Sequence, residues 1–173
     1  MTTLYTPRLT IRPLTPADLP ALVVYRNDPE VARFQGWPLP STLEQVQGLV
    51  SAAAAPLGAP GWVQRAVVDG DVLLGDVALN TQGQQAELGV TLARAAQGQG
   101  YAREAIQAVL GHAFGALQLH RVHAAIDPRN EAVARLLTRL GFRHEGIARL
   151  AYFHRGEWTD EARYGLLASE WTP

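Results

Sequence analysis

The stretch that decides the fold is Gln97-Gly98-Gln99-Gly100-Tyr101-Ala102, which lies between an alternating segment, Gln85–Leu92, and a strongly periodic one. Glycines let the backbone turn tightly and bring successive N–H groups towards one anion. A helix that begins directly after them adds unpaired N–H groups and about half a positive charge. The stretch therefore predicts a pyrophosphate site, with a merely tight strand-to-helix turn as the alternative.

The same residues exclude two familiar kinds of phosphate loop. A Walker A loop carries Gly-Lys-Ser/Thr after its first glycines, and this chain contains no lysine. A dinucleotide-binding loop needs a third glycine, whereas Arg103 stands at that position. The loop alone thus indicates an anion without indicating a class of nucleotide-binding protein.

The residues before the loop predict a meander of three strands. Hairpin-turn residues at Asp69–Asp71 and Asn80–Gly83 separate segments rich in alternating apolar side chains. The predicted antiparallel strands are Trp62–Val68, Val72–Leu79 and Gln85–Leu92.

The residues after the loop predict a strand between two helices. Apolar side chains from Ala102 to Leu117 recur at helical spacing, and Arg121–Ile126 is apolar enough for a buried strand. A second amphipathic helix is predicted to begin at Asn130 and to end at Gly141. Strands joined by a helix usually pair in parallel, so the strands on either side of the first helix are expected to be parallel neighbours.

The remaining segments predict the flanking elements. Arg8–Leu14 alternates as a strand does, and Thr15 is a suitable N-cap for a helix that runs to about Asn27. The other predicted elements are a short helix over Pro29–Phe34, a loop at Gly36–Pro40, a helix opening with a capping box at Ser41–Glu44, and strands near Arg143–Phe153 and Asp160–Ala168.

Composition limits the kinds of protein that this chain can be. Its 173 residues, 47% hydrophobic and 18% charged, predict a single globular domain over residues 1–173. A formal net charge of −1 argues against a nucleic-acid or anionic-membrane surface. The absence of cysteine excludes disulfides, thiolate metal sites and cysteine nucleophiles. With no signal-peptide core and no membrane-length apolar stretch, the expected location is the cytoplasm.

Gln97-x-x-Gly100-x-Ala102 resembles the (Gln/Arg)-x-x-Gly-x-(Gly/Ala) signature of the GCN5-related N-acetyltransferases, the GNAT superfamily. Further motifs match its ribosomal-protein N-acetyltransferase (RimJ/RimL-like) branch in order and spacing, over nearly the whole chain. They are Thr6–Leu14, Ala17-Asp18, Asn27–Val31, Phe34–Trp37, Glu87–Gly89, Gly98–Ala102, Asn130–Ala132, Leu140–Phe142 and Gly156–Asp160, with Tyr164 and Trp171.

The resemblance implies a fold and an activity. The implied fold is of the α/β (α+β) class, with a mixed, mostly antiparallel sheet that is splayed into a V, flanked by helices, and holds acetyl-CoA in the V-shaped cleft. The implied activity is acetyl transfer from acetyl-CoA to a primary amine, with a protein N-terminal α-amine among the acceptors. Relatives of this kind are monomers or homodimers.

The resemblance also implies where the donor binds. It places the pyrophosphate on backbone N–H groups of the glycine loop and the pantetheine arm along the preceding strand, with an N–H near Val90 polarising the thioester. Asn130 matches a position whose amide contacts the pantetheine arm, although asparagine is also a favoured N-cap. The implied cofactor-binding residues are Val90, Thr91, Leu92, Gln97, Gly98, Gln99, Gly100, Tyr101, Ala102 and Asn130.

The candidate base and the acceptor residues lie outside the loop. Glu87 is the candidate general base because the branch carries a glutamate there, whereas alternation alone favours an exposed polar residue. Asp76 and Glu157 are weaker candidates for the same role. The aromatic side chains expected to line the acceptor cleft are Phe34, Trp37, Tyr152 and Trp158, with core packing as the alternative.

No general acid is assigned. The branch commonly carries a serine where this chain has Val133, and other branches carry a tyrosine where it has Leu137. Tyr152 and Tyr164 remain as hydroxyl groups that nothing in the sequence positions. This departure keeps a non-catalytic acyl-CoA-binding module open beside a second alternative, a small-amine or antibiotic acetyltransferase.

Two histidines and four arginines are not assigned to the site. His120 and His123 lack a third ligand, so no metal site is predicted. Most of the four arginines near the second helix are interpreted as solvated, with contact to the CoA 3′-phosphate as the alternative; they are Arg129, Arg135, Arg139 and Arg143.

Overall fold

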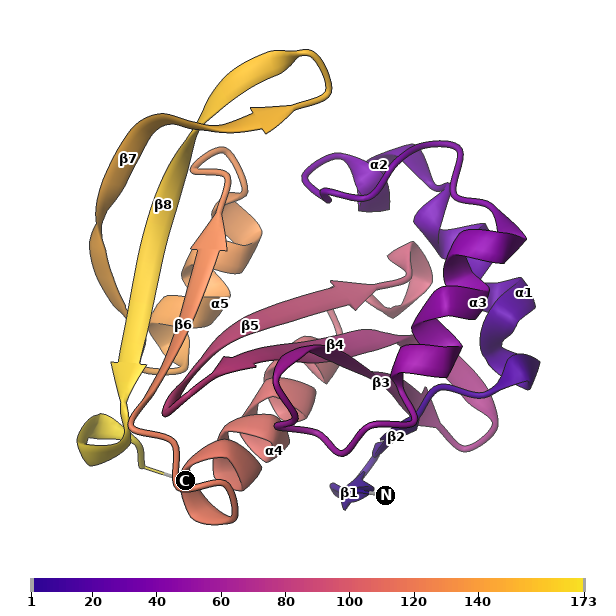
Figure 1. Cartoon of the computed structure of the whole chain (residues 1–173), viewed down its shortest axis with the longest axis horizontal. Helices are drawn as coiled ribbons and strands as arrows, with labels where there is room; N and C mark the ends of the chain where they lie inside the picture. Colours follow the sequence, from indigo (N-terminus) through magenta and orange to yellow (C-terminus); the bar gives the residue numbers. More distant parts are fainter. Residues whose placement is uncertain (1, 173) are drawn as a thin grey trace.

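One eight-stranded mixed sheet organises residues 2–172, which are the residues that the computed structural model describes. Its spatial order is β1-β2-β3-β4-β5-β6-β8-β7 (Figure 1), and only β5 and β6 pair in parallel. The strands are β1 Leu4–Tyr5, β2 Thr10–Pro13, β3 Gly61–Asp69, β4 Val72–Gln82, β5 Gln85–Leu92, β6 Arg121–Ile126, β7 Arg143–His154 and β8 Glu157–Leu167. The predicted mostly antiparallel sheet and its parallel pair are both confirmed.

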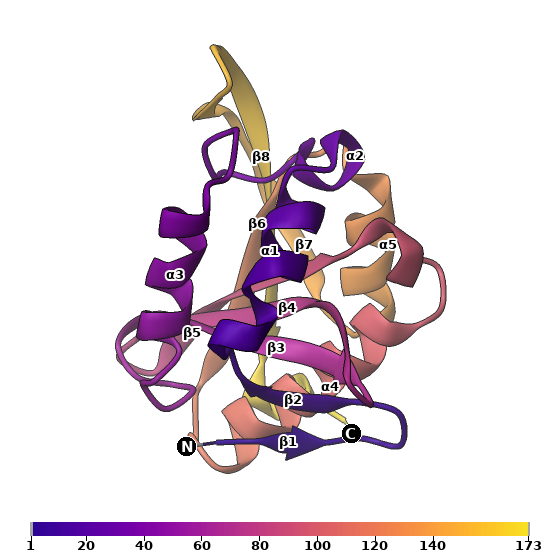
Figure 2. The same cartoon turned by 90° about the vertical axis from the view of Figure 1, so that its right-hand side faces the viewer.

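Helices cover both faces of this sheet. α1 and α3 lie on one side, and α4 and α5 lie on the other (Figures 1 and 2). The helices are α1 Leu19–Arg26, α2 Pro29–Ala32, α3 Leu43–Ala52, α4 Tyr101–Gly115 and α5 Glu131–Arg139, with short 3-10 turns at Pro16–Asp18, Arg94–Ala96 and Ala168–Glu170. Within residues 2–172, none of the helices combines the length and the apolar character of a membrane span.

The alternation of β3 creates two separate cores. Ala66 and Val68 face α1 and α3, whereas Val67 faces α4 from the opposite side of the sheet. Successive side chains of a strand point to opposite faces, so one strand serves both cores. The core under α4 is the larger, and Ile106, Val109 and other fully buried residues of that helix fill it.

The parallel pairing between β5 and β6 is short. It joins Gln85 to Arg121, Ala86 to Val122 and Glu87 to His123, and then the two strands diverge. β5 continues beside β4, while β6 continues beside β8, as Figure 1 shows. The sheet is therefore splayed into a V that opens just after Glu87.

The hairpin between β4 and β5 turns later than the sequence predicts. Asn80 and Thr81 lie inside the predicted turn but pair with Glu87 and Ala86, so β4 extends to Gln82. The turn itself begins at Gly83, which adopts a positive φ of 60°. The longer pairing overrides the local turn preference of Asn80 and brings its side chain next to that of Glu87.

The capping box of α3 lies one residue later than predicted. Thr42 is the N-cap, its hydroxyl accepts a hydrogen bond from the Gln45 N–H at 3.4 Å, and the Gln45 side chain accepts from the Thr42 N–H. Ser41 is instead buried, and its hydroxyl accepts a hydrogen bond from Arg26. A tertiary contact therefore decides which hydroxyl caps the helix.

A buried carboxylate ties α1 to the sheet. Asp76 on β4 is 3% exposed and accepts hydrogen bonds from the Tyr25 hydroxyl and from Gln64. Burial raises the pKa of Asp76, and burial together with the neighbouring carboxylate raises that of Tyr25. Asp76, a weaker candidate base in the sequence, is thus enclosed under α1.

Tyr25→Phe should lower the free energy of unfolding by about 1–3 kcal/mol at neutral pH, because the buried Asp76 carboxylate loses a donor. The loss should shrink as the pH falls through the raised pKa of Asp76, since a neutral carboxyl group is cheaper to bury. Urea unfolding at several pH values measures both effects. Tyr5→Phe is the control, because Tyr5 is 77% exposed and should change stability little; equal stability of the two variants would contradict the prediction.

Candidate active site

A cleft of about 490 Å³ occupies the opening of the V. Strands β5 and β6 contribute its floor, the β7–β8 hairpin one wall and the loop after α2 another. The lining residues are Phe34, Gln35, Gly36, Trp62, Glu87, Leu88, Gly89, Ala125, Ile126, Asp127, Tyr152, His154, Thr159, Asp160 and Glu161. Of the residues predicted from sequence, the cleft brings together Glu87, Phe34 and Tyr152.

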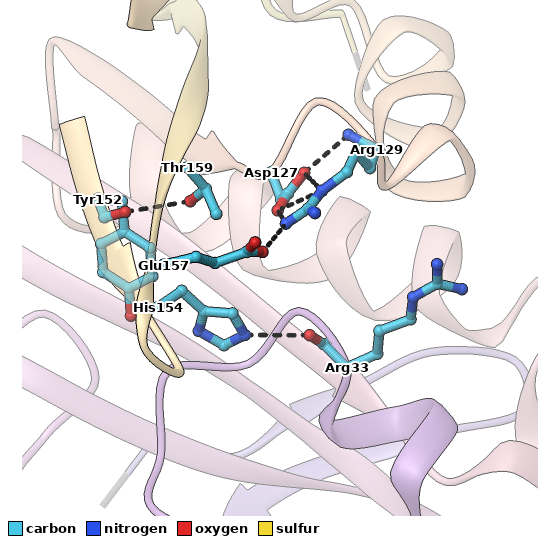
Figure 3. A network of polar contacts seen from close by, with 7 residues as sticks. All are labelled: Arg33, Asp127, Arg129, Tyr152, His154, Glu157 and Thr159. Carbon is cyan, nitrogen blue, oxygen red and sulfur yellow. Dashed lines mark hydrogen bonds and ion pairs between the residues drawn. The ribbon is translucent and has the colours of Figure 1, made fainter. Parts of the chain in front are cut away.

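The tip of the β7–β8 hairpin closes this cleft on one side. Nε2 of His154 donates a hydrogen bond to the Arg33 carbonyl at 3.1 Å (Figure 3), and Arg155 donates to the Ala32 carbonyl at 3.1 Å. Gly36 lies against Tyr152 so closely that a Cβ there would collide with the tyrosine hydroxyl. The two arms of the V are therefore bridged above the cleft.

An ion-pair network joins Asp127, Arg129 and Glu157 beside this bridge. The Arg129 guanidinium donates to both carboxylate oxygens of Asp127, at 2.6 to 3.1 Å, and to Glu157 at 3.1 Å (Figure 3). The hydrogen bonds from Arg129 lower the pKa of Asp127. Arg129 is thus used within the protein, and Glu157, another weaker candidate base, is its partner rather than a cleft residue.

Glu87 lies at the point where the strands separate. It forms the last parallel pair, with His123, and it is half-buried on the face of β5 that points into the cleft. It also lines a smaller polar hollow of about 170 Å³ with Asn80, Gln82, Gln85 and His123. Burial lowers the pKa of His123, which favours its neutral form beside the glutamate.

The glycine loop has the geometry of an anion site. Gly98 and Gly100 adopt positive φ angles of 76° and 82°, and Gly100 is the N-cap of α4. The backbone N–H groups of Gly98, Gln99 and Gly100 donate no hydrogen bond to any residue between 2 and 172. The Gln97 side chain bonds back to the Leu92 carbonyl at 3.1 Å and so fixes the start of the loop. Free N–H groups at a helix N-terminus fit a pyrophosphate.

The edge of β5 beyond Glu87 connects this loop to the cleft. Residues Leu88–Leu92 pair with β4 on one side and have no partner strand on the side of β6 within the described chain. Val90, Thr91 and Leu92 therefore present an open edge, where an extended amide-containing chain can add as a strand does.

Asn130 and Val133 lie at the N-terminus of α5. The Asn130 side chain caps the helix by accepting a hydrogen bond from the Val133 N–H at 3.4 Å. The Val133 side chain is half-buried and packs against the large core. The alternative interpretation of Asn130 as an N-cap is confirmed, and it leaves the amide N–H₂ of the side chain able to donate.

Three aromatic residues lie outside the cleft. Trp37 does not line it: the ring stacks on the Arg26 guanidinium at 3.9 Å, and the indole N–H donates to the Arg26 carbonyl. Trp158 is exposed and packs on Phe153 of the same hairpin. The Tyr164 ring packs in the large core beside His144, and Tyr164 is not among the residues that line the cleft.

Trp62 is a cleft residue that the sequence analysis did not single out. Its ring lies over Gly89, where a Cβ would come within 3.3 Å of the indole. The sequence could have indicated this contact, because an isolated glycine inside a strand, here Gly89, often marks the close approach of another group. His154 and Glu161 carry no such signal, and Thr159 and Asp160 belong to the matching motif Gly156–Asp160 without being singled out as cleft residues, because the hairpin reaches the cleft only through the tertiary fold.

The described residues contain no cluster of three or more His, Asp or Glu side chains that could hold a metal ion. His120 directly precedes β6, and His123, within β6, belongs to the hollow beside Glu87. The groups that the site presents are backbone donors, carboxylates and aromatic side chains.

Comparison with known proteins identifies the same family as the sequence motifs. Residues 8–143 match the acetyltransferase (GNAT) domain family. The chain is 31% identical over 177 residues to p20 of Bacillus licheniformis, an uncharacterized N-acetyltransferase, and the match covers 99% of each chain.

Two further comparisons concern a solved structure and a relative of known activity. A GNAT-family acetyltransferase from Bacillus anthracis superimposes with a TM-score of 0.87 at 28% identity, covering 98% of this chain and 100% of the other. The ribosomal protein uS5-alanine N-acetyltransferase of Escherichia coli is 34% identical over 86 residues, which are 50% of this chain and 44% of that protein. The resemblance noted in the sequence and the fold that it implies are confirmed.

Gly100→Val should abolish the thermal stabilisation that CoA gives the protein. A β-branched residue at a φ of 82° is strained, so the loop must change shape and lose its aligned N–H groups. Thermal unfolding with and without CoA measures the shift. Gly111→Val is the control, because Gly111 lies inside α4 with open space where a Cβ would stand. If CoA raised the unfolding temperature of Gly100→Val as much as that of the wild type, the assignment of the loop as the pyrophosphate site would be contradicted.

Proposed function

The chain belongs to the GNAT acetyltransferase family, and from that premise we propose that it transfers the acetyl group of acetyl-CoA to the α-amine at the N-terminus of a protein. The observation that carries the proposal is the open edge of β5, which joins an anion-binding loop to a cleft containing a carboxylate. Acetyl-CoA supplies the activated acetyl group in this reaction, and its supply in the cytoplasm makes that compartment the proposed location.

The donor is held by backbone groups. The N–H groups of the Gln97–Ala102 loop bind the pyrophosphate, and the pantetheine amides pair with the open edge at Val90–Leu92. This arrangement brings the thioester to the cleft end of β5, where an N–H near Val90 polarises its carbonyl group. A preorganised donor at a developing oxyanion is worth about 3 kcal/mol.

Glu87 acts as the general base. An amine attacks the thioester only when it is neutral, so the ammonium proton passes to the Glu87 carboxylate, directly or through water. The polar hollow that Glu87 shares with His123 and Asn80 gives this proton a route to solvent while the acceptor fills the cleft. The position of Glu87 between the two hollows supports this role.

The leaving thiolate departs without a dedicated acid. Val133 carries no proton donor, and Tyr164 does not line the cleft. A thiol with a pKa of about 8.5 is a tolerable leaving group as the thiolate near neutral pH. The tetrahedral intermediate therefore collapses by breaking the C–S bond, and water protonates the released sulfur.

The bridged cleft favours the slender end of a chain as acceptor. The contacts of His154 and Arg155 with the loop after α2 close one side, so a side chain in the middle of a folded protein has little access. Phe34, Trp62 and Tyr152 give the first residue apolar surface to pack against. The similarity to a ribosomal-protein N-terminal alanine acetyltransferase agrees with an acceptor of this kind.

A small polycationic amine is the second candidate acceptor. Four carboxylate side chains line the cleft: Glu87, Asp127, Asp160 and Glu161. Only part of this charge is neutralised, by Arg129 on Asp127 and by Arg163 on Glu161. The remaining negative charge attracts a flexible amine with several positive charges.

A panel of acceptors should separate these candidates. Thiol release from acetyl-CoA is measured with peptides that begin with alanine or serine, with the same peptides carrying a blocked N-terminus, and with spermidine. Peptide turnover that N-terminal blocking abolishes supports the proposal. Turnover with spermidine alone would assign the second candidate, and CoA binding without turnover on any amine would overturn both.

Glu87→Gln should retain CoA binding and lose turnover, by about 10²–10⁴-fold where the amine is fully protonated. The deficit should shrink as the pH rises, because the free amine then needs no base. The pH profile of kcat/KM from pH 6 to 9 measures this. Glu44→Gln, at an exposed position on α3, is the control. A wild-type profile for Glu87→Gln would contradict its assignment as the base and leave it an ordinary polar residue of the strand.

A further inference from the structure

Arg8 joins the N-terminal segment of the chain to the glycine loop. It lies between β1 and β2, yet its guanidinium group donates to the Gln99 carbonyl at 3.1 Å across 91 positions of sequence. The same group lies 4.4 Å from the centre of the Tyr101 ring. A Cβ at Gly100 would stand 3.5 Å from Nη2 of Arg8, so the guanidinium flanks the loop directly.

Glu104 fixes the position of Arg8. Its carboxylate accepts hydrogen bonds from the Thr6 hydroxyl at 2.6 Å, from the Arg8 N–H at 3.0 Å and from Nε of Arg8 at 2.7 Å. Nη2 of Arg8 also lies 2.6 Å from the same carboxylate. Both the backbone and the side chain of Arg8 are therefore held against the first turn of α4.

The bond to Gln99 determines the direction of a neighbouring donor. In a trans peptide unit, the C=O and N–H groups point in opposite directions. Holding the Gln99 carbonyl towards Arg8 therefore turns the Gly100 N–H away from Arg8, where it remains unpaired among the described residues. Gly100, on one side of this peptide, is a glycine with a positive φ, so the bond from Arg8 adds a restraint at a position where the backbone is intrinsically permissive.

The charge of Arg8 has a second effect. The Glu104 carboxylate lies one turn inside the helix N-terminus that receives the anion, and it would repel that anion. The Arg8 guanidinium neutralises it at close range and leaves the positive end of the helix dipole available.

We propose that Arg8 is a positioning residue for the CoA pyrophosphate, which acts by orienting the Gln99–Gly100 peptide and by neutralising Glu104. The identity of the ligand rests on the proposed function. A contribution to global stability does not explain the arrangement, because the Arg8 side chain is 44% exposed and exposed ion pairs stabilise proteins little.

Arg8→Ala should weaken CoA binding by about tenfold, the loss expected for one charge-assisted hydrogen bond. Isothermal titration calorimetry with CoA measures this without any acceptor, so the result stands even if no amine is acetylated. The turnover of S-acetylpantetheine, which lacks the pyrophosphate, should be unchanged. Arg8→Lys keeps the charge but loses the planar fork, so its affinity for CoA should fall between those of the wild type and Arg8→Ala.

Arg121→Ala is the matched control, because Arg121 forms a similar two-pronged ion pair with Glu145 away from the loop. It should leave CoA affinity unchanged. Wild-type CoA affinity in Arg8→Ala would overturn the proposal, and so would an equal loss with CoA and S-acetylpantetheine, which would indicate a general structural role. Should Arg8→Ala fail to fold, the affinity of Arg8→Lys decides the question: a value equal to that of the wild type overturns the proposal.

Discussion

The parallel contact between β5 and β6 lasts for three residue pairs and then ends, and the rest of the site depends on that limit. Longer pairing would place β6 along Leu88–Leu92 and cover the edge that we assign to pantetheine. Shorter pairing would remove the link between the halves of the sheet. β6 diverges because it pairs along its whole length with β8, while β5 remains paired with β4. Competition between the outer neighbours therefore opens the V.

The two arms of the V meet again above the cleft. The hairpin donates from His154 and Arg155 to backbone carbonyl groups of the loop after α2. Contacts to backbone acceptors depend on the path of the loop more than on its side chains. The bridge therefore fixes the shape of the acceptor entrance, while Phe34 and Gln35 remain free to determine what enters.

The two ends of the site carry opposite electrostatic character. At the glycine loop, free N–H groups, the N-terminus of α4 and the neutralised Glu104 favour an anion. In the cleft, the carboxylates of Glu87 and Asp160 favour a cation. Groups that favour an anion and groups that favour a cation therefore lie at different ends of the site, and the open edge of β5 lies between them.

The sequence by itself determined the strand and helix order, the loop glycines and the position of Glu87 on an alternating strand, because turns, caps and periodicity act within a few residues. Only the tertiary structure decided that Trp62 covers Gly89, that Trp37 stacks on Arg26 outside the cleft, and that β4 extends through Asn80. It also brought Arg8 to Gln99 and His154 to Arg33, pairs separated by 91 and 121 positions. Such contacts leave no local pattern, since their energy comes from groups that meet only after the sheet has formed.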